Sequence, residues 1–408
     1  MKLDELGVVG RGKSKHRPRN DPSLYGGPYP FIQTGDVKEA DLWLTQFTQT
    51  YNEKGLAQSK LWPIGTLCIT IAANIAETAI LKLPACFPDS IVGLRPHPGK
   101  ADARFIKYYI DTLKVRMQNA SKGTTQDNLS VDKLTTFDFA VPEFSVQDRI
   151  ASILSAYDDL IENNTRRIKI LEDMAQMIYR EWFVNFRFPG HEKVRMVESE
   201  LGPIPEGWSA KCVTDAVFVN PATKVPKEGV KPFLPMGCLA DNSMLITNVE
   251  EREGNSGAKF KNGDTLFARI TPCLENGKTG FVQFLPSDDA VAFGSTEFIV
   301  LRSRTVCPEY VYLMARSDEF RDNAIKSMSG ASGRQRVREA CFDSFFIAEP
   351  DGGSLERFKG ITSPVFRLIQ TLSLKNDNLR TTRDLLLPKL ISGEISVEAA
   401  AELMEQTA

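Results

Sequence analysis

The chain has 408 residues, of which 42% are apolar and 25% are charged, a composition typical of a globular protein with two or three domains. It contains no run of about 18 apolar residues and no apolar signal region near Met1, so we expect no membrane span and a cytoplasmic location. The net charge of −2 excludes a uniformly basic nucleic-acid binder, yet segments 11–19 and 326–338 each carry several cations and no carboxylate.

The sequence contains an internal repeat. Three segments of a first copy recur in the same order in a second copy: 30–37 and 232–239, 66–71 and 265–270, and 105–109 and 310–314. Each copy then runs through a Gly-, Ser- or Thr-bearing stretch, an apolar strand that ends in a proline (Pro142 or Pro350), and a long helix. Chance explains one matching pair but not all of these features in one order. We therefore predict two similar units, which suit a target in two parts.

Apolar runs and turns predict an α+β fold in which two globular units are joined by two long antiparallel helices. The expected regions are a first unit (1–145), a central spacer helix (146–188), a linker (189–202), a second unit (203–352), a C-terminal spacer helix (353–393) and a tail (394–408). Within the units we expect strands at 67–71, 91–94, 266–270 and 297–301, and helices near 103–118 and 308–327.

A heptad pattern marks the central helix, which is expected from Gln147 to about Phe186. Apolar residues recur in steps of three and four without glycine or proline, which is the pattern of a coiled-coil seam of about five heptads. Asn164 interrupts the seam, as a polar residue does when it fixes the register. The predicted seam consists of Ile150, Leu154, Tyr157, Ile161, Asn164, Ile168, Leu171, Ala175, Ile178 and Trp182.

A second seam is predicted near the C-terminus. It consists of Val365, Ile369, Leu372, Leu379, Leu386 and Leu390, and Asn376 and Arg383 interrupt it. This segment is expected to be shorter than the central helix, with Pro364 and Pro388 starting, kinking or ending its helical stretches. Two such helices most simply pair with each other. The alternative is that each packs only on its own globular unit, although a helix of about 40 residues is longer than one small domain needs.

Patterns typical of enzymes fail on inspection. A DNA amino-methyltransferase needs a Pro-Pro-aromatic motif and a Gly-rich cofactor loop, and Gly27-Pro28-Tyr29 supplies neither. Gly277-Lys278-Thr279 ends like a phosphate-binding loop, but Pro272 stands where the first glycine is needed. Three widely spaced histidines and seven scattered cysteines predict reduced thiols and no metal site. We expect a protein that catalyses nothing.

Several motifs, in a fixed order, resemble the specificity subunits of type I restriction-modification systems. Segments 122–130, 139–143 and 147–154 resemble the junction where a target recognition domain of that family passes through a turn and a strand into its spacer helix. Segment 201–208, Leu-Gly-Pro-Ile-Pro-Glu-Gly-Trp, looks like the opening of the second recognition domain, and segment 390–395 looks like the end of the C-terminal helix. The first copy lacks the Pro-x-Gly-Trp opening, so its first strand is expected to be absent or its start to differ.

The resemblance, which covers nearly the whole chain, implies a specificity subunit that binds double-stranded DNA and serves defence against foreign DNA. Each recognition domain would read one half of a bipartite, asymmetric target, and the spacer helices would set the unread gap. Two modification (methyltransferase) subunits, bound through those helices, would methylate adenine at N6 with S-adenosylmethionine. Restriction and translocase subunits would cleave DNA with ATP and Mg. This chain itself would hold no cofactor.

Candidate DNA contacts are short polar and cationic side chains on turns. The amides and hydroxyls of segment 122–128 suit base edges, and arginines beside Gln335 suit guanine or phosphate. Other cations would neutralise the DNA backbone. The expected contacts are Lys13, Lys15, Arg17, Arg19, Lys122, Thr124, Thr125, Gln126, Asn128, Lys224, Lys227, Lys231, Arg269, Ser332, Arg334, Gln335, Arg336 and Arg338. The plainer alternative for each is a solvated loop residue.

Two other functional classes fit the repeat. A coiled-coil scaffold would tether two proteins, and a free-standing bipartite regulator would bind DNA without partners. Only a specificity subunit would need a methyltransferase for its activity. Recognition loops follow no transferable code, so the sequence leaves open the DNA target, the gap length and the presence of a restriction subunit.

Overall fold

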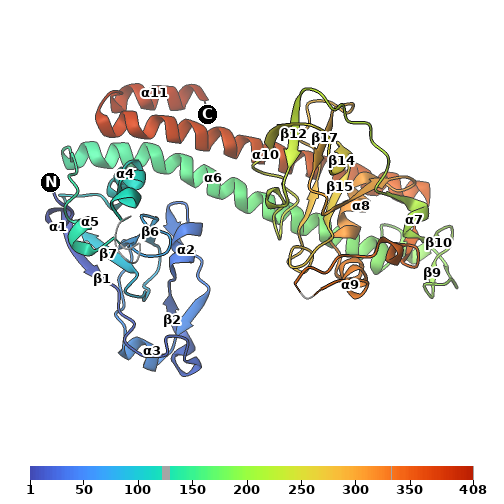
Figure 1. The fold of residues 1–408 in the computed structure, drawn as a ribbon, viewed down its shortest axis with the longest axis horizontal. Coiled ribbons are helices and arrows are strands. Elements are labelled where there is room, and N and C mark those ends of the chain that lie inside the picture. Colours follow the sequence, from blue (N-terminus) through green and yellow to red (C-terminus); the bar gives the residue numbers. More distant parts are fainter. Residues whose placement is uncertain (122–128, 332, 408) are drawn as a thin grey trace. The chain divides into compact units, whose positions relative to one another are not determined.

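The chain folds as two units that both contain helices and sheets (Figure 1). The computed structural model describes residues 1–121, 129–331 and 333–407. Unit 1 comprises Met1–Asn163 and Asn376–Ala408, and unit 2 comprises Asn164–Lys375. Helices α6 (Phe144–Tyr179) and α10 (Gly352–Ser392) each contribute residues to both units. The α+β class predicted from the sequence is confirmed.

Unit 1 is built on a five-stranded sheet in the order β1-β7-β5-β6-β3, in which only the β3–β6 pair is parallel. Helix α4 places Phe105, Ile106 and Tyr108 in one apolar cluster with the strand residues Leu67 and Val92, so burial of these side chains holds the helix on the sheet. The elements of unit 1 outside the long helices are α1 (Leu3–Leu6), β1 (Gly7–Arg11), η1 (Pro22–Leu24), β2 (Tyr25–Phe31), α2 (Thr34–Glu39), β3 (Trp43–Leu44), β4 (Gln49–Tyr51), α3 (Glu53–Ala57), β5 (Leu67–Thr70), β6 (Thr78–Leu81), β7 (Ile91–Pro96), α4 (Ala103–Ser121), α5 (Val131–Leu134) and α11 (Val397–Thr407).

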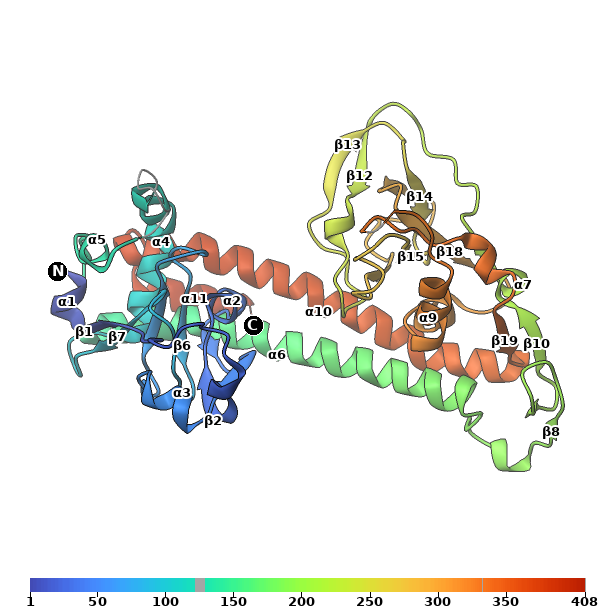
Figure 2. The same cartoon turned by 60° about the horizontal axis from the view of Figure 1, so that its bottom comes forward.

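Unit 2 contains two four-stranded sheets, in the orders β11-β18-β15-β16 and β13-β12-β17-β14 (Figure 2). Two two-stranded sheets, β10-β19 and β8-β9, complete it. Its elements are η2 (a π-helical turn, Arg180–Val184), η3 (His191–Lys193), β8 (Met196–Val197), β9 (Ile204–Pro205), β10 (Ser209–Cys212), α7 (Val213–Ala216), β11 (Val217–Val219), β12 (Val230–Leu234), η4 (Met236–Cys238), β13 (Glu250–Glu253), β14 (Ala258–Lys261), β15 (Thr265–Ala268), β16 (Thr279–Phe281), β17 (Val291–Gly294), β18 (Phe298–Ser303), α8 (Pro308–Ala315), α9 (Asp318–Lys326), η5 (Glu339–Phe342) and β19 (Phe346–Glu349).

The two units repeat one topology. The order β1-β7-β5-β6 in unit 1 corresponds to β11-β18-β15-β16 in unit 2. The parallel pair β12–β17 of unit 2 has its counterpart in the parallel bridge between Phe31 and Cys86 in unit 1. The internal repeat predicted from the sequence is therefore present in the fold.

The long helices pair antiparallel within each unit. In unit 1 the side-chain amide of Asn376 donates to the carbonyl of Ile161 at 3.4 Å, and Arg383 pairs with Asp158, so residue numbers rise on α6 while they fall on α10. In unit 2 the rings of Trp182 and Phe358 lie 5.9 Å apart. The predicted seam positions are buried or half-buried along both helices. No helix of the described residues is long and apolar enough to cross a membrane.

The expected break of the second helix at its prolines is wrong. Helix α10 runs through Pro364 and Pro388 and, with 41 residues, is longer than α6 with 36. A proline inside a helix removes one backbone hydrogen bond and crowds the carbonyl four residues earlier. Close to Pro364, however, Phe366 and Ile369 are 2% and 0% exposed, so tertiary packing outweighs the local preference.

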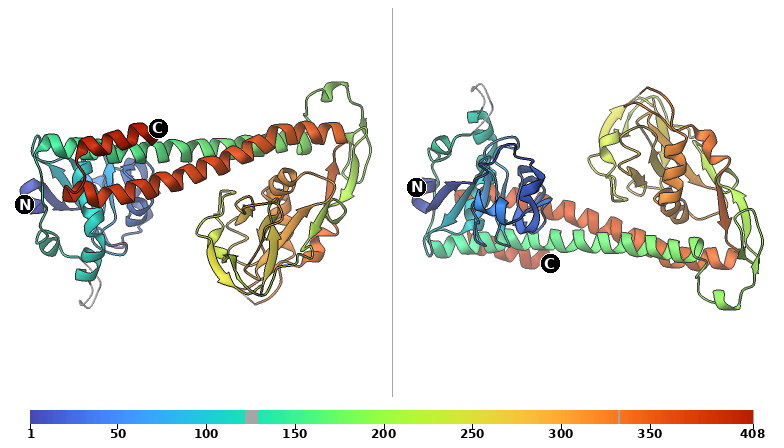
Figure 3. Two further views of the ribbon diagram at one scale, coloured as in Figure 1. Left: turned by 90° about the horizontal axis from the view of Figure 1, so that it is seen from above. Right: turned by 90° about the horizontal axis from the view of Figure 1, so that it is seen from below.

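Three smaller expectations also differ from the structure. Residues 135–143 form no strand before Pro142; instead, Phe139 exchanges hydrogen bonds of 2.9 and 2.8 Å with the backbone of Met1. The helix expected at 308–327 is divided into α8 and α9, because the Ser317 side chain caps the second helix by accepting from the N–H of Phe320. The tail contains α11, the short helix that leads to the C mark in Figure 3. Its residues Val397 and Ala400 belong to the apolar cluster of unit 1.

Candidate nucleic-acid interface

A narrow loop at residues 329–336 is the best-defined candidate contact in unit 2. The N–H groups of Ser329 and Arg336 each donate to the other residue's carbonyl at 3.0 Å and close the loop. Inside it, Gly330 and Gly333 have φ values of +129° and +80°, which glycine adopts without a clash of Cβ. Gln335 bonds Thr271 twice, through its carbonyl and its N–H, each at 3.1 Å. The loop is thus fixed at its base, and Ala331, Gly333 and Arg334 are exposed.

The two arginines of this loop differ in their availability. Arg336 forms a forked pair with Glu297, with Nε 2.9 Å from Oε2 and Nη2 2.6 Å from Oε1. The hydrogen bond from Arg336 lowers the pKa of the Glu297 carboxyl, so this carboxylate stays charged and neutralises Arg336. Arg334 is exposed, and no acid of the described residues lies within ion-pair distance of it. Among the described residues Arg334 therefore has no acidic partner, whereas Arg336 is held by Glu297.

The neighbouring cations brace the loop. Arg338 Nε donates to the Ser329 hydroxyl at 2.8 Å. Arg269 pairs with Glu339 at 3.0 Å and donates to the Val337 carbonyl at 3.4 Å. The geometry gives both residues a local structural contact, in addition to any contact with DNA.

The basic loop of unit 1, residues 11–19, alternates buried and exposed positions. Gly12 and Ser14 are buried, and the N–H of Lys13 donates to the Phe87 carbonyl at 3.0 Å. The four predicted cations, Lys13, Lys15, Arg17 and Arg19, are all exposed.

The partners of these four cations differ. Arg17 donates to the Ser14 carbonyl at 2.6 Å, and Arg19 pairs with Asp89 at 2.7 Å. No carboxylate of the described residues pairs with Lys13, Lys15 or Arg17, so the charges of these three cations are uncompensated, whereas Asp89 neutralises Arg19.

The remaining predicted contacts fall into two groups. Lys224 and Lys227 are exposed in unit 2, while Lys231 donates to the carbonyl of Glu228 at 2.6 Å. Lys122, Thr124, Thr125, Gln126, Asn128 and Ser332 lie outside the described residues.

The described residues that flank these segments show where the chain is anchored. Leu129 donates to the carbonyl of Ile71, just beyond β5, at 2.9 Å, and Val337 donates to the carbonyl of Arg269, just beyond β15, at 2.9 Å. Since β5 and β15 are corresponding strands, each unit anchors the chain at the same place in its sheet.

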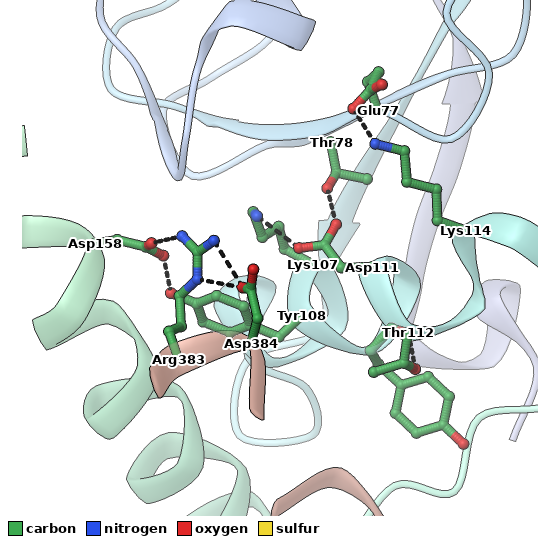
Figure 4. Close-up of polar contacts among 11 residues, drawn as sticks. Glu77, Thr78, Lys107, Tyr108, Asp111, Thr112, Lys114, Asp158, Arg383 and Asp384 are labelled. Carbon is green, nitrogen blue, oxygen red and sulfur yellow. Dashed lines mark hydrogen bonds and ion pairs between the residues drawn. The ribbon is translucent and has the colours of Figure 1, made fainter. Parts of the chain in front are cut away.

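A buried ionic group that the sequence reasoning missed lies within unit 1 (Figure 4). Asp158 of α6 is 2% exposed and accepts hydrogen bonds from the Tyr108 hydroxyl of α4, at 2.5 Å, and from Arg383 of α10. Arg383 also pairs with Asp384 at 2.8 Å. Burial, together with the Asp158 carboxylate, raises the pKa of Tyr108 far above its usual range, so Tyr108 acts as a donor.

The signal for Asp158 was present in the sequence. Its position, four residues after Leu154 and three before Ile161, is that of a residue on the buried helix face.

A second polar group in Figure 4 attaches α4 to the sheet. Asp111 pairs with Lys107 at 2.7 Å and accepts from the Thr78 hydroxyl at 3.0 Å, and Lys114 pairs with Glu77 at 2.7 Å. These side chains line a surface groove of about 550 Å³. Every acid in the group has a partner, which makes it a brace between α4 and β6. Across the described parts of the chain, no group of three or more His, Cys, Asp and Glu side chains could hold a metal ion.

Comparison with solved structures identifies the class of the fold. The S subunit of a type I restriction-modification system from M. genitalium superposes with a TM-score of 0.56 at 13% sequence identity, over 96% of this chain and 95% of that one. The fold is therefore that of a type I S subunit.

Sequence comparison shows similarity to the same class of protein. Residues 1–173 match the type I restriction modification DNA specificity domain. The type I restriction enzyme MjaIX specificity subunit of Methanocaldococcus jannaschii is 23% identical over 97% of this chain and 93% of its own length. The HindI specificity subunit of Haemophilus influenzae is 21% identical over 69% of this chain and 74% of its own length. By these comparisons the chain is similar over most of its length to type I restriction-modification specificity subunits, which agrees with the resemblance seen in its motifs.

Proposed function

We propose that this chain is the DNA-reading, non-catalytic subunit of a type I restriction-modification complex. Each unit reads one half of a bipartite, asymmetric target in double-stranded DNA. The observation that carries the proposal is the repeated topology, in which Leu129 and Val337, next to the two polar segments, hydrogen-bond just beyond the ends of the corresponding strands β5 and β15. Two units of one topology but different side chains suit two half-sites of different sequence.

Direct reading is assigned to side chains that are free to approach base edges. Arg334, exposed beside an anchored Gln335, can form the forked contact that arginine makes with O6 and N7 of guanine. Thr124, Gln126 and Asn128 carry the matching donors and acceptors for unit 1. The exposed lysines would neutralise phosphates and set the overall affinity without choosing the sequence.

Two methyltransferase subunits are proposed to bind through the long helices. Within unit 2, Ile170, Met174 and Met177 of α6 are 57%, 47% and 65% exposed. Their spacing of four and three residues places them on one helix face, and methionine adapts readily to a partner's surface. A groove of about 550 Å³ between α6 and α9 continues this face at Met177 and Val184.

The chemistry of the complex is assigned to these partners and not to this chain. S-adenosylmethionine would serve adenine-N6 methylation in the methyltransferase subunits. ATP and Mg would serve DNA cleavage in the restriction and translocase subunits.

The test is to map methylated adenines in cells with the gene, without it, and with the gene restored. We expect a split motif that disappears with the gene and returns only when the chain and its methyltransferase are both present. A protein scaffold would leave the methylation map unchanged and bind no DNA. A free-standing regulator would bind its target as tightly without the methyltransferase as with it.

A further inference from the structure

The two units differ in the partners of one arginine that occupies the same position in both sheets. Strands β7 and β18 end Leu-Arg-Pro and Leu-Arg-Ser, and Arg95 and Arg302 each pair with the second residue of the neighbouring strand, Val8 of β1 and Phe218 of β11. Arg95 is therefore the unit 1 counterpart of Arg302.

In unit 2 this arginine is neutralised. Arg302 forms a forked pair with Asp264, with Nε and Nη2 at 2.6 and 2.7 Å from the two carboxylate oxygens, and donates to the Thr223 hydroxyl at 2.9 Å. Asp264 is 1% exposed, so the ion pair is largely shielded from solvent.

In unit 1 the neutralising carboxylate is replaced by a hydroxyl. Asp264 follows Gly263, whose N–H bonds to the Val282 carbonyl; Thr66 follows Gly65, whose N–H bonds in the same way to Leu81. Thr66 is thus the counterpart of Asp264, and its hydroxyl donates to the Pro63 carbonyl.

A lysine replaces the second partner of the arginine. Lys13 stands three residues beyond Gly10 of β1, as Thr223 stands three beyond Asn220 after β11. No carboxylate of the described residues pairs with Arg95 or Lys13, and both side chains are exposed.

A third cation joins this pair. Lys60 Nζ lies 3.6 Å from the centre of the Trp62 ring. The residue of unit 2 that corresponds to Lys60 is Ala258, which carries no charge. Burial and then the positive charges of Lys13 and Arg95 lower the pKa of Lys60, so Lys60 lies within electrostatic reach of both cations.

The platform under Lys60 is rigid. Trp62 is fully buried and stacks on Phe87 with ring centres 5.0 Å apart. A Cβ at Gly10 or Gly93 would come within 3.1 or 2.8 Å of the Trp62 ring, so these glycines make room for it.

We infer that Lys13, Lys60 and Arg95 form a phosphate-binding cluster that grips the sugar-phosphate backbone of DNA and that unit 2 lacks. Three uncompensated cations repel one another until an anion joins them, and arginine offers a forked contact to phosphate beside two lysine point charges. This inference rests on the proposed DNA-reading function. It adds that the half-site of unit 1 is held by a stronger backbone contact than that of unit 2.

The first experiment measures the salt dependence of binding by the full chain, assembled with its methyltransferase, to a duplex carrying the mapped target and to an unrelated duplex. The triple variant Lys13→Ala, Lys60→Ala, Arg95→Ala is compared with a control of equal charge change, Lys38→Ala, Lys100→Ala, Arg116→Ala, whose residues are also exposed in unit 1. Each lost phosphate contact should flatten the slope of log K against log salt by about 0.9, and the cluster variant by about two to three. The control slope should equal that of the wild type.

A second variant installs the unit 2 arrangement in unit 1 without removing Arg95. Thr66→Asp with Lys13→Thr should pair Arg95 internally and flatten the slope by about as much as losing two contacts. Circular dichroism of each variant checks that the fold is intact. If the double variant misfolds, the comparison of the triple variant with its control still tests whether the cluster binds the DNA backbone.

The outcomes separate the inference from the function on which it rests. If the cluster and control variants flatten the slope equally, or neither does, the cluster is not a backbone contact. Calorimetry with inorganic phosphate tests whether the cluster binds a free phosphate ion instead of the phosphates of DNA. Phosphate binding that the cluster variant loses, with DNA binding unaltered, would assign the cluster to a small anion and overturn the inference. If the wild-type complex binds no DNA at all, the proposed function itself fails.

Discussion

Replacing Arg383 with methionine should destabilise unit 1 more than any other single loss of charge on α10. Methionine keeps most of the length and apolar stem of arginine but leaves the Asp158 carboxylate, 2% exposed, with Tyr108 as its remaining side-chain donor. Removing one partner of a buried ion pair typically costs about 3–5 kcal/mol, because the other charge stays buried without compensation. The matched control is Arg380→Met. Arg380 pairs with Asp377, their side chains are 42% and 63% exposed, and such surface pairs contribute about 0–1 kcal/mol.

Hydrogen exchange of the full chain, followed by mass spectrometry on peptides from α4 and from the part of α10 after Asn376, reports the free energy of opening in unit 1. The Arg383→Met protein should lose about two to four orders of magnitude of protection, and the Arg380→Met protein less than one. Adding Asp158→Asn to Arg383→Met should restore part of the protection, because the stranded charge is then gone. Equal protection in the two arginine variants, or a double variant as unstable as the sum of its single changes, would refute the reasoning.

Four further outcomes are expected. If Arg334 reads guanine, Arg334→Ala should weaken binding to the mapped target by about 1–3 kcal/mol, measured by fluorescence anisotropy. Arg336→Ala should weaken binding less, because Glu297 already holds that side chain. Unchanged affinity in both variants would mean that this loop does not contact DNA. Exchanging residues 203–350 for those of a relative should change one half of the methylated motif, and a change in both halves would disprove independent reading. Four residues inserted near 165–168 of α6, with four more opposite them in α10, would lengthen each helix by about 6 Å. The unread gap in the DNA target should then widen by one or two base pairs. An unaltered gap with full activity would mean that the helices do not set the gap. Because Arg336 lowers the pKa of Glu297, the ion pair should stabilise the 329–336 loop at every pH above 4.5, the ordinary pKa of glutamate. This stabilisation should be lost as the pH falls through the lower pKa of the folded state. In the Glu297→Gln variant, hydrogen exchange of the loop should not show this pH dependence.

Sequence patterns predicted what depends on periodicity and repetition. The seam residues of α6, such as Leu154 and Ile161, are buried because a helix that hides one face must place apolar side chains every three or four residues. The repeat was visible because corresponding strands keep similar residues, as in Pro-Phe at 30–31 and 232–233. The effect of Pro364 on the helix was predicted wrongly, because its local destabilisation of the helix is outweighed by packing against residues far away in the chain. No local sequence pattern shows that packing.

The candidate site was only partly predictable for a related reason. The sequence marks Arg334 and Arg336 as equivalent loop cations, yet one is exposed and the other is held by Glu297, 39 residues earlier. That difference arises from strand register, which brings the start of β18 beside the loop. In the same way, the contrast between Arg95 and Arg302 emerges only when the two sheets are compared strand by strand, since Thr66 and Asp264 are separated from their arginines by other strands and turns.

Unit 1 is assembled from both ends of the chain, and this has a consequence for its synthesis. Its apolar cluster begins with Leu3 and Leu6 and is completed by Leu390, Val397 and Ala400, while unit 2 is the uninterrupted stretch Asn164–Lys375. Domains usually fold in the order in which the ribosome delivers them. Here unit 2 can fold before residues 376–408 of unit 1 have been synthesised. Unit 1, whose first residues are translated first, is therefore the unit that completes its fold last. A ribosome that stops before residue 376 would release a finished second unit attached to an open first one, with Asp158 still lacking its arginine.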